Sequence, residues 1–370
     1  MPSLLRVPFM SGNALVISGG TAKGAYAAGL IHELFSRHEE LRKHVRYFSG
    51  TSTGSLIVPM LALYCATGKR DYLDRIPSRY EVDSDAVWHA EPRTWKGKLV
   101  ARLVRRRVGA TDPAKFVGHL VEEGAGLDTE PLHRMIDREY GDDLLRELFD
   151  NKDKVEAMVN CVSAQTGRVE MFSSADPQMT PAIYRAAIYA SCLQPIIMPL
   201  SDVEHPSIGR QQYMDGGIRD VIPIRAAWNA GADRVFAIAL ADRETAPTAD
   251  RFEGPGGVPR LLLRVLLGLL DQEVADDDIN EARYIATIGR LARFVPKEKL
   301  AAELSLIGSD DLPKFQRERL FADLYVHRPE AALSNKLTWS KAQMMGWIAE
   351  GEAAADGEEG QRIDAFLMAA

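Results

Sequence analysis

The first 66 residues alternate twice between a short apolar run and a helical pattern, with a glycine-rich turn after each run. Strands are predicted over residues 14–18 (ALVIS) and 45–49 (VRYFS), and helices over residues 23–35 and 55–66. This order predicts parallel strands joined by right-handed crossovers. Both glycine-rich turns then lie at the carboxyl edge of the sheet, where open α/β sheets hold their sites.

The rest of the chain continues the pattern of strands and helices. Two runs, 154–163 and 168–173, flank the turn AQTG and predict a hairpin. Further strands are predicted over 211–214, 233–240 and 324–327, and further helices over 181–192, 258–293 and 339–355. We therefore expect an α/β fold in which helices sandwich a mostly parallel central sheet.

We expect the 370 residues to form a single domain with a core over about residues 13–355. Residues 80–126 lack clear strands and predict a helical insertion, or lid, over the sheet. Residues 255–320 predict a helical C-terminal part. The tail from Glu350 is acidic and rich in alanine and glycine, which predicts a surface helix that frays.

Composition and charge exclude several classes of protein. Hydrophobic residues make up 46% of the chain and charged residues 26%, which is typical of a globular protein. The net charge of -7 argues against a nucleic-acid binder. Three cysteines without metal-ligand spacing indicate a reducing compartment and no disulfide framework. Without a signal peptide or a membrane-length apolar run, we expect a cytoplasmic protein.

A G-x-S-x-G pattern places Ser52 between Gly50 and Gly54. The pattern alone is weak evidence, because it occurs by chance in roughly one chain in ten of this length. Here it follows a predicted strand and opens a predicted helix, as a nucleophile elbow requires. The helix N-terminus there favours an anionic acyl-transfer intermediate.

A second glycine-rich turn, residues 18–24 (SGGTAKG), also lies between a strand and a helix. Its backbone N–H groups are suited to hold an oxyanion. The competing interpretation is a phosphate-binding loop. The segment matches neither common nucleotide-binding pattern, and Ser49 and Gly50 stand where a ribose-binding acid is expected. A nucleotide-binding α/β protein therefore remains the weaker alternative.

The third feature is Asp215, followed by Gly216 and Gly217 after a predicted strand. A strand end in an α/β sheet brings this carboxylate to the edge that carries Ser52, where it acts as a general base if it is partly desolvated. A serine–acid–histidine triad would have to use His327, the one histidine after Asp215. An α/β-hydrolase normally has several strands before its nucleophile elbow, whereas only one clear strand precedes the strand of Ser52 here. His327 also lies in a predicted strand, so we expect a structural or surface histidine.

These motifs resemble those of the patatin-like phospholipase family. The family has a G-G-G-x-[RK]-G oxyanion loop, a G-x-S-x-G elbow and a D-G-[GA] motif, which residues 19–24, 50–54 and 215–217 match in the same order. The flanking segments 187–195 and 324–329 are similar as well. The likeness covers roughly residues 13–355 and is weak over 80–126 and 245–320.

The resemblance implies a serine–aspartate dyad without histidine, metal or cofactor. Ser52 is then the nucleophile and Asp215 the base. The oxyanion donors correspond to the backbone of Gly19, Gly20 and Thr21. The supporting residues would be Lys23, Gly50, Gly54, Gly216 and Gly217.

Thr21 and Lys23 are the two positions of the oxyanion loop at which the sequence differs from the family pattern or allows two interpretations. Thr21 stands where the family has a third glycine, and a positive φ there would strain a threonine. The backbone N–H survives, so we expect altered rather than lost activity. Lys23 either assists a phosphate or the oxyanion, or is simply a basic residue in the first turn of a helix, and the sequence favours neither.

Three further segments have a structural and a functional interpretation. Residues 93–107 run from Arg93 to Arg107 with seven basic residues and no acidic one, which predicts a packed amphipathic helix or a membrane-docking lid. Residues 261–270 predict a buried helix or the wall of an acyl pocket. Residues 276–278 (DDD) lack the alternation of a Ca²⁺ loop and predict a solvated helix start.

The function that fits these features is serine acyl hydrolysis of fatty-acyl esters in phospholipids or related lipids. The expected partner is a lipid or ester substrate, and the docking interpretation of residues 93–107 adds a peripheral membrane contact. No nucleic acid is expected, and the sequence carries no signal for an oligomeric state. Alternatives are a small-ester or thioester hydrolase of the same fold, and a non-catalytic lipid-binding protein.

Overall fold

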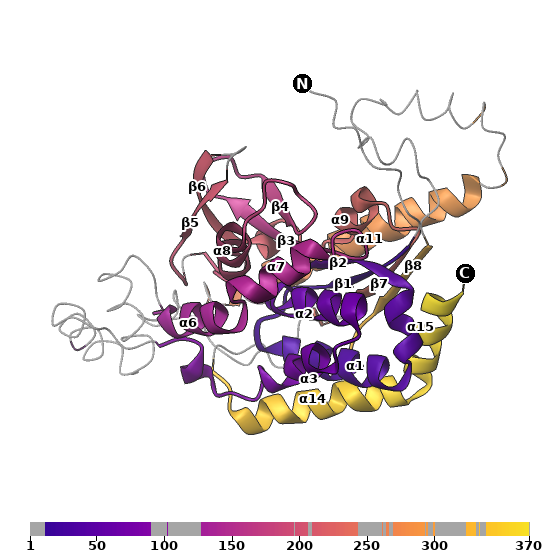
Figure 1. Ribbon diagram of the computed structural model, residues 1–370, viewed down its shortest axis with the longest axis horizontal. Helices are drawn as coiled ribbons and strands as arrows, with labels where there is room; N and C mark the ends of the chain where they lie inside the picture. Colours follow the sequence, from indigo (N-terminus) through magenta and orange to yellow (C-terminus); the bar gives the residue numbers. More distant parts are fainter. Residues whose placement is uncertain are drawn as a thin grey trace.

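The protein is an eight-stranded sheet between two layers of helices (Figure 1). The computed structural model describes residues 12–89, 127–195, 197–205, 209–242, 269–292, 323–330 and 338–369, together with residues 102, 261, 264–265, 294, 299 and 333. Most of the insertion predicted over 80–126, including the basic segment 93–107, lies outside this part. Its predicted lid and membrane contact therefore stay predictions.

The sheet has the strand order β5-β6-β3-β2-β1-β7-β8, and β4 pairs with β3. The strands are β1 (Asn13–Ile17), β2 (Val45–Gly50), β3 (Glu156–Ser163), β4 (Val169–Ser173), β5 (Ser201–His205), β6 (Gly209–Asp215), β7 (Arg234–Ile238) and β8 (Asp323–His327). Strands β3, β2, β1, β7 and β8 run parallel, whereas β4, β5 and β6 form antiparallel pairs. The mostly parallel sheet and the hairpin of β3 and β4 are confirmed.

Strand β3 is longer than its parallel partner β2, and this overhang positions the site. Gly50 at the end of β2 pairs with Val159, and β3 continues beyond it. The antiparallel strand β6 pairs with this extension, where Asp215 lies opposite Cys161. The end of β6 therefore reaches the carboxyl edge of β2 from the opposite direction.

Successive side chains of a strand pack alternately into two separate hydrophobic cores. Leu15 and Ile17 of β1 face one cluster, and Ala14 and Val16 face the other, as the two-residue period of a strand requires. The helices that contribute to the first cluster are α1 (Gly24–Arg37), α2 (Thr53–Thr67), α3 (Arg70–Ser78), α6 (Glu130–Glu139), α7 (Asp142–Asp150), α8 (Pro181–Ser191), α14 (Lys341–Asp356) and α15 (Glu358–Met368). The second cluster is covered by α9 (Ile224–Ala230) and α11 (Leu270–Ala292).

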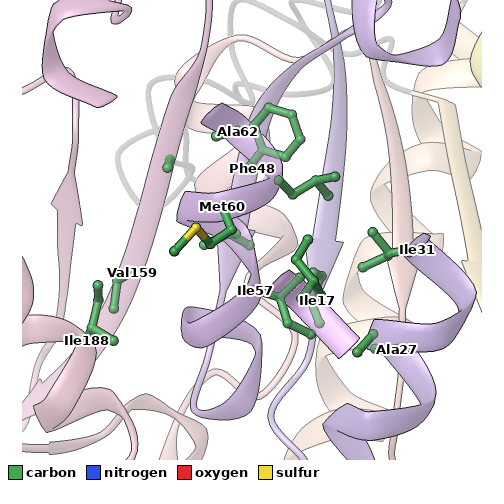
Figure 2. Packing of buried hydrophobic residues seen from close by; sticks show 14 of the residues in the cluster. Ile17, Ala27, Ile31, Phe48, Ile57, Met60, Ala62, Val159 and Ile188 are labelled. Atoms are coloured by element: carbon green, nitrogen blue, oxygen red, sulfur yellow. The ribbon is translucent and has the colours of Figure 1, made fainter. Parts of the chain in front are cut away.

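Figure 2 shows the packing on the first face of the sheet. Ile17 of β1 lies among Ile57 of α2 and the α1 residues Ala27 and Ile31, while Val159 of β3 lies beside Ile188 of α8. Helix α2 is apolar nearly all round, with twelve of its fifteen residues buried. A helix of this kind belongs in the middle of a layer, and α2 therefore gives the turn before it a rigid base.

The expectation that the tail frays is wrong. Helix α14 continues to Asp356, and α15 follows it to Met368 (Figure 1). Ile363 and Leu367 of α15 are buried in the first core. The acidic composition of this segment concealed small and apolar residues that pack on α1 from α14, and on β7 and α14 from α15.

The expectation of a buried helix over residues 261–270 is also wrong for the part that the structure describes. Leu261, Leu269 and Leu270 are 44%, 43% and 50% exposed. The buried face of α11 begins later, with Ala275, Ile279 and Ala282. A run that is apolar at nearly every position, interrupted only by Arg264 and Gly268, carries no helical periodicity, so it did not reveal which face would be covered.

Close contact between α1 and α14 depends on glycines, which predicts a measurable effect on stability. A Cβ at Gly351 would lie 2.1 Å from the Tyr26 carbonyl oxygen, whereas a Cβ at Gly346 on the same helix meets nothing within 4 Å. We expect Gly351→Ala to lower the free energy of unfolding by about 1–3 kcal/mol. Gly346→Ala is the control and should be neutral or stabilise by up to about 1 kcal/mol. Urea unfolding measures both, and equal effects would contradict the close packing.

Candidate active site

Ser52 sits in a sharp turn between β2 and α2. Its backbone has φ 52° and ψ -120°, a left-handed conformation that few residues other than glycine adopt. Hydrogen bonds on both sides hold the turn: the Gly54 N–H donates to the Thr51 carbonyl (2.8 Å) and the Ser55 N–H to the Ser52 carbonyl (2.9 Å). Ser52 is 6% exposed and lies at the N-terminus of α2. This is the geometry of a nucleophile elbow.

The two glycines of the elbow allow the backbone to pack this tightly. A Cβ at Gly50 would lie 2.5 Å from the Gly54 carbonyl carbon, and a Cβ at Gly54 would lie 2.3 Å from the Ile17 carbonyl oxygen. The elbow therefore rests directly on the end of β1. Any larger side chain at either position must displace backbone.

The loop after β1 lies beside Ser52, as the sequence predicts. A Cβ built on Gly19 would be 3.4 Å from the Ser52 Cβ, and Gly20 packs against Leu240. The Gly19 N–H, however, donates to the Val221 carbonyl (3.0 Å), so this amide already has a partner. The amides of Gly20 and Thr21 are the better candidates for an oxyanion.

Thr21 has a positive φ, which is the condition that makes threonine unfavourable here. Its φ is 52°, and it begins the short helical turn Thr21–Lys23 that leads into α1. A β-branched residue in this region costs of order 1–3 kcal/mol unless the surroundings hold it there. The rest of the fold therefore stabilises this loop in a conformation that its sequence disfavours.

The structure places Lys23 in a structural ion pair. Its side chain is 2% exposed, and its Nζ lies 3.3 Å from the Asp242 carboxylate. Asp242 follows β7 and also accepts a hydrogen bond from the Leu333 N–H (3.2 Å). Lys23 thus ties the oxyanion loop to the neighbouring strand end. Of its two interpretations, this contact supports the structural one.

Asp215 ends β6 as a fully buried carboxylate, which meets the requirement of desolvation. Its Oδ1 accepts from the Gly217 N–H (2.8 Å) and its Oδ2 from Gln194 Nε2 (3.2 Å). Gln194 follows α8 and lines the same cavity as Ser52. Sequence reasoning missed Gln194 as a site residue, although it lies in the 187–195 segment that resembles the family.

Asn160 of β3 joins the two halves of the site. Its Oδ1 accepts from the Thr51 hydroxyl (2.6 Å), and its Nδ2 donates to the Asp220 carbonyl (3.0 Å). The same hydroxyl lies 3.0 Å from the Asp220 carbonyl. A Cβ at Gly216 would lie 2.5 Å from Asn160 Oδ1. The residue before Ser52 and the loop after Asp215 are therefore held by one buried amide, which no sequence motif marked.

A second residue that sequence reasoning missed is Ser191, at the end of α8. Its hydroxyl accepts from the Ser52 N–H (2.9 Å). The amide of Ser52 is thereby satisfied by a side chain more than a hundred residues away. No local pattern distinguishes this serine.

His327 makes hydrogen bonds with side chains other than those of Ser52 and Asp215. At the end of β8, its Nε2 shares a hydrogen bond with the Tyr26 hydroxyl (2.9 Å), and its Nδ1 lies 2.7 Å from the Glu359 carboxylate. The ring also stacks on Tyr26 with 5.8 Å between centroids. His327 is a buried link between β8, α1 and α15, as expected for a structural histidine.

Ser52 opens into a narrow apolar cavity of about 70 Å³. Trp88 and Trp339, which meet edge to face with 4.6 Å between ring centroids, form part of its wall. The other lining residues are Thr21, Ala22, Thr53, Leu56, Arg79, Tyr80, Val82, Val87, Leu132, Met135, Cys192, Gln194, Met198 and Met344. Such a lining suits a hydrocarbon chain beside the serine.

Asp278 supports the loop after Asp215, so the expectation that residues 276–278 are a solvated helix start is wrong. These residues lie inside α11, and Asp276 pairs with Arg328. The Asp278 carboxylate accepts from the Ile222 N–H (2.9 Å). Burial and the nearby Asp220 raise the pKa of Asp278 to about 8, and burial raises the pKa of Asp220 to about 6. This pair lies behind the site rather than in it.

No group of three or more His, Cys, Asp or Glu side chains that are described is arranged to hold a metal ion. None of the described helices combines the length and apolar character needed to cross a bilayer.

Comparison with known proteins identifies the family. The sequence profile of the patatin-like phospholipase family matches residues 15–228, more than half of the chain. The protein belongs to the patatin-like phospholipase family. Family membership supports a lipid acyl hydrolase activity, and the matched residues include Ser52, the loop of residues 18–24 and Asp215.

Two solved structures are similar at low scores. VipD from Legionella pneumophila is 13% identical, over 97% of this chain and 68% of that chain, with a TM-score of 0.38. The complex of SpcU with ExoU from the type III secretion system of Pseudomonas aeruginosa contains a chain 12% identical, over 96% of this chain and 73% of that chain, with a TM-score of 0.23. No curated protein sequence gives a significant match.

The raised pKa values of Asp220 and Asp278 predict a pH-dependent stability. The folded state keeps protons that the unfolded state releases near pH 4, so the free energy of unfolding falls as pH rises from about 4 to 8. Asn resembles the protonated acid and still accepts from Ile222. The free energy of unfolding of Asp278→Asn, measured relative to that of wild type, should therefore rise by at least about 1 kcal/mol from pH 5 to pH 9.

Denaturant unfolding at several pH values measures this gain. Asp277→Asn, at the neighbouring exposed position, is the control and should follow the wild-type pH profile. Parallel profiles for wild type and Asp278→Asn would rule out a buried protonated carboxyl at this position.

Proposed function

We propose that the protein is a serine acyl hydrolase that cleaves fatty-acyl esters of phospholipids or related lipids, with Ser52 as nucleophile and Asp215 as general base. The observation that carries the proposal is the strained elbow of Ser52 in the lining of an apolar cavity. Strained backbone at a nucleophile exposes its hydroxyl to substrate. The buried Asp215, joined to the elbow through Asn160, Thr51 and the loop after β6, supports the assignment of the base.

In this mechanism, Asp215 takes the proton of the Ser52 hydroxyl as its Oγ attacks the ester carbonyl carbon. The amides of Gly20 and Thr21 and the N-terminus of α2 stabilise the tetrahedral oxyanion. The intermediate expels the alcohol, which takes the proton from Asp215 and leaves an acyl-enzyme. Water then attacks the acyl carbon and gives a proton to Asp215. The fatty acid leaves, and the proton returns to Ser52.

Fluorophosphonate labelling in excess EDTA, followed by mass spectrometry of the modified peptide, tests the dyad. We expect a phosphonyl group on Ser52 in wild type, and a loss of about 100-fold or more in labelling rate in Asp215→Asn, since general-base catalysis contributes 10²–10⁴-fold. His327→Ala, if folded, should still be labelled.

Two outcomes would contradict this proposal. Labelling that survives in Asp215→Asn but disappears in folded His327→Ala would indicate a triad. A folded wild type that is never labelled but binds lipid vesicles would indicate a non-catalytic lipid-binding protein.

The bridge through Asn160 predicts that the Thr51 hydroxyl positions Ser52. Thr51→Val keeps the shape of the side chain and removes the donor to Asn160. We expect a fall in kcat of about 10- to 100-fold with little change in KM, because small displacements of reacting groups have effects of this size. Thr51→Ser retains the hydroxyl and should stay close to wild type. A purely structural role would affect both variants equally, or stability alone.

A further inference from the structure

A second, larger hollow adjoins the cavity at Ser52. It has a volume of about 730 Å³ and lies between α3, the segment 78–89 and α6. Arg79, Val82, Val87 and Met135 line both hollows, so the two are neighbours across a shared wall. The remaining lining residues are Arg75, Ser78, Ala86, His89, Pro131, Arg134, Arg138 and Glu139.

The described lining of this second hollow is strongly basic. Four arginines face one carboxylate, Glu139, which lies 2.9 Å from Arg75, 3.2 Å from Arg79 and 3.0 Å from Arg138. Arg75, Arg138 and Arg79 hold the pKa of Glu139 down at about 2 against the opposing effect of burial. Among the described lining residues, one carboxylate does not balance four guanidinium groups, so this part of the hollow carries an excess of positive charge.

Two further carboxylates lie outside the lining. Asp71 is 3.7 Å from Arg75, and Glu130 is 3.7 Å from Arg134. Both are well exposed, and ion pairs of this kind in water are worth 1 kcal/mol or less. They therefore leave the arginines available to an anion.

We propose that this basic hollow binds the phosphate of a lipid headgroup while the acyl chain of the same lipid lies at Ser52. The proposal rests on the acyl hydrolase function and narrows its substrate to lipids that carry phosphate. In a glycerophospholipid, the phosphate and the acyl esters share one glycerol, which matches two hollows that share a wall. Guanidinium groups bind phosphate oxygens through paired N–H donors.

The arginines differ in how firmly they are held. Arg79 is 7% exposed, and its guanidinium donates to the Tyr140 hydroxyl (2.6 Å) and lies 4.7 Å from the centre of that ring. Tyr140 in turn donates to the carbonyl of Leu56, a residue of the Ser52 cavity. Arg134 and Arg138 are 69% and 74% exposed. Arg79 is therefore held in place at the boundary of the two hollows, whereas Arg134 and Arg138 make only exposed ion pairs with Glu130 and Glu139, which a phosphate can replace.

Steady-state kinetics with a matched pair of soluble substrates tests the proposal. Dihexanoyl phosphatidic acid and dihexanoylglycerol have the same acyl chains and differ in the phosphate. We expect the double variant Arg134→Gln/Arg138→Gln to raise KM for the phosphatidic acid about tenfold or more, with kcat and the constants for dihexanoylglycerol within about twofold. Arg146→Gln/Arg362→Gln removes the same charge from exposed positions outside the hollow and should match wild type.

Equal changes for both substrates, or a change of the same size in the control variant, would overturn the proposal. Inorganic phosphate distinguishes the two sources of the anion. Competition with phosphatidic acid in wild type means that the hollow takes free phosphate as well, and lack of competition means that it needs the lipid-linked group.

A binding experiment separates this proposal from the catalytic one. Calorimetry with Ser52→Ala measures the binding of dihexanoyl phosphatidic acid without turnover. We expect binding that the Arg134→Gln/Arg138→Gln changes weaken about tenfold or more, even if no substrate is hydrolysed. Affinity that is unaffected by these changes would exclude the hollow as the phosphate site.

Discussion

The unfavourable backbone of Ser52 is the constraint on which the site depends. A serine at φ 52° and ψ -120° is strained by about 1–3 kcal/mol and stays there only because its surroundings leave no alternative. Gly50 and Gly54 bring the turn against β1, and the Ser191 hydroxyl accepts the Ser52 N–H. Because α2 is buried almost all round, the elbow cannot relax without moving the core. The stability of the whole layer therefore holds one side chain in place.

Strand β3 brings the two halves of the site together. It pairs in parallel with β2 and in antiparallel with β6, so the strand that ends at the serine and the strand that ends at the aspartate meet on one support. Asn160 lies where these pairings adjoin, and its buried amide is satisfied on both sides. Buried polar groups of this kind specify a single arrangement, because any other leaves a donor or acceptor unpaired. The relative positions of Ser52 and Asp215 therefore depend on the strand pairings of the sheet as well as on the loops.

Local patterns predicted much of this fold and several of the site positions. The first two strands and helices followed from the spacing of apolar residues and from the two glycine-rich turns. The short strand β5 and the helices α3, α6, α7 and α9 were not predicted, because brief elements carry too few periods to stand out. Residues 276–278 were misjudged because an acidic triplet gives no sign that Asp278 turns inward to accept the Ile222 N–H.

The sequence by itself determined the parallel α/β opening, the elbow of Ser52 and the position of Asp215 at a strand end, because each follows from a local pattern of a few neighbouring residues. Only the tertiary structure decided that Asp215 arrives on an antiparallel strand, that Lys23 pairs with Asp242, and that Asn160, Ser191 and Gln194 support the site. These contacts join residues that lie from about twenty to more than two hundred positions apart. Their formation depends on sheet order and burial, which no local pattern of side chains records.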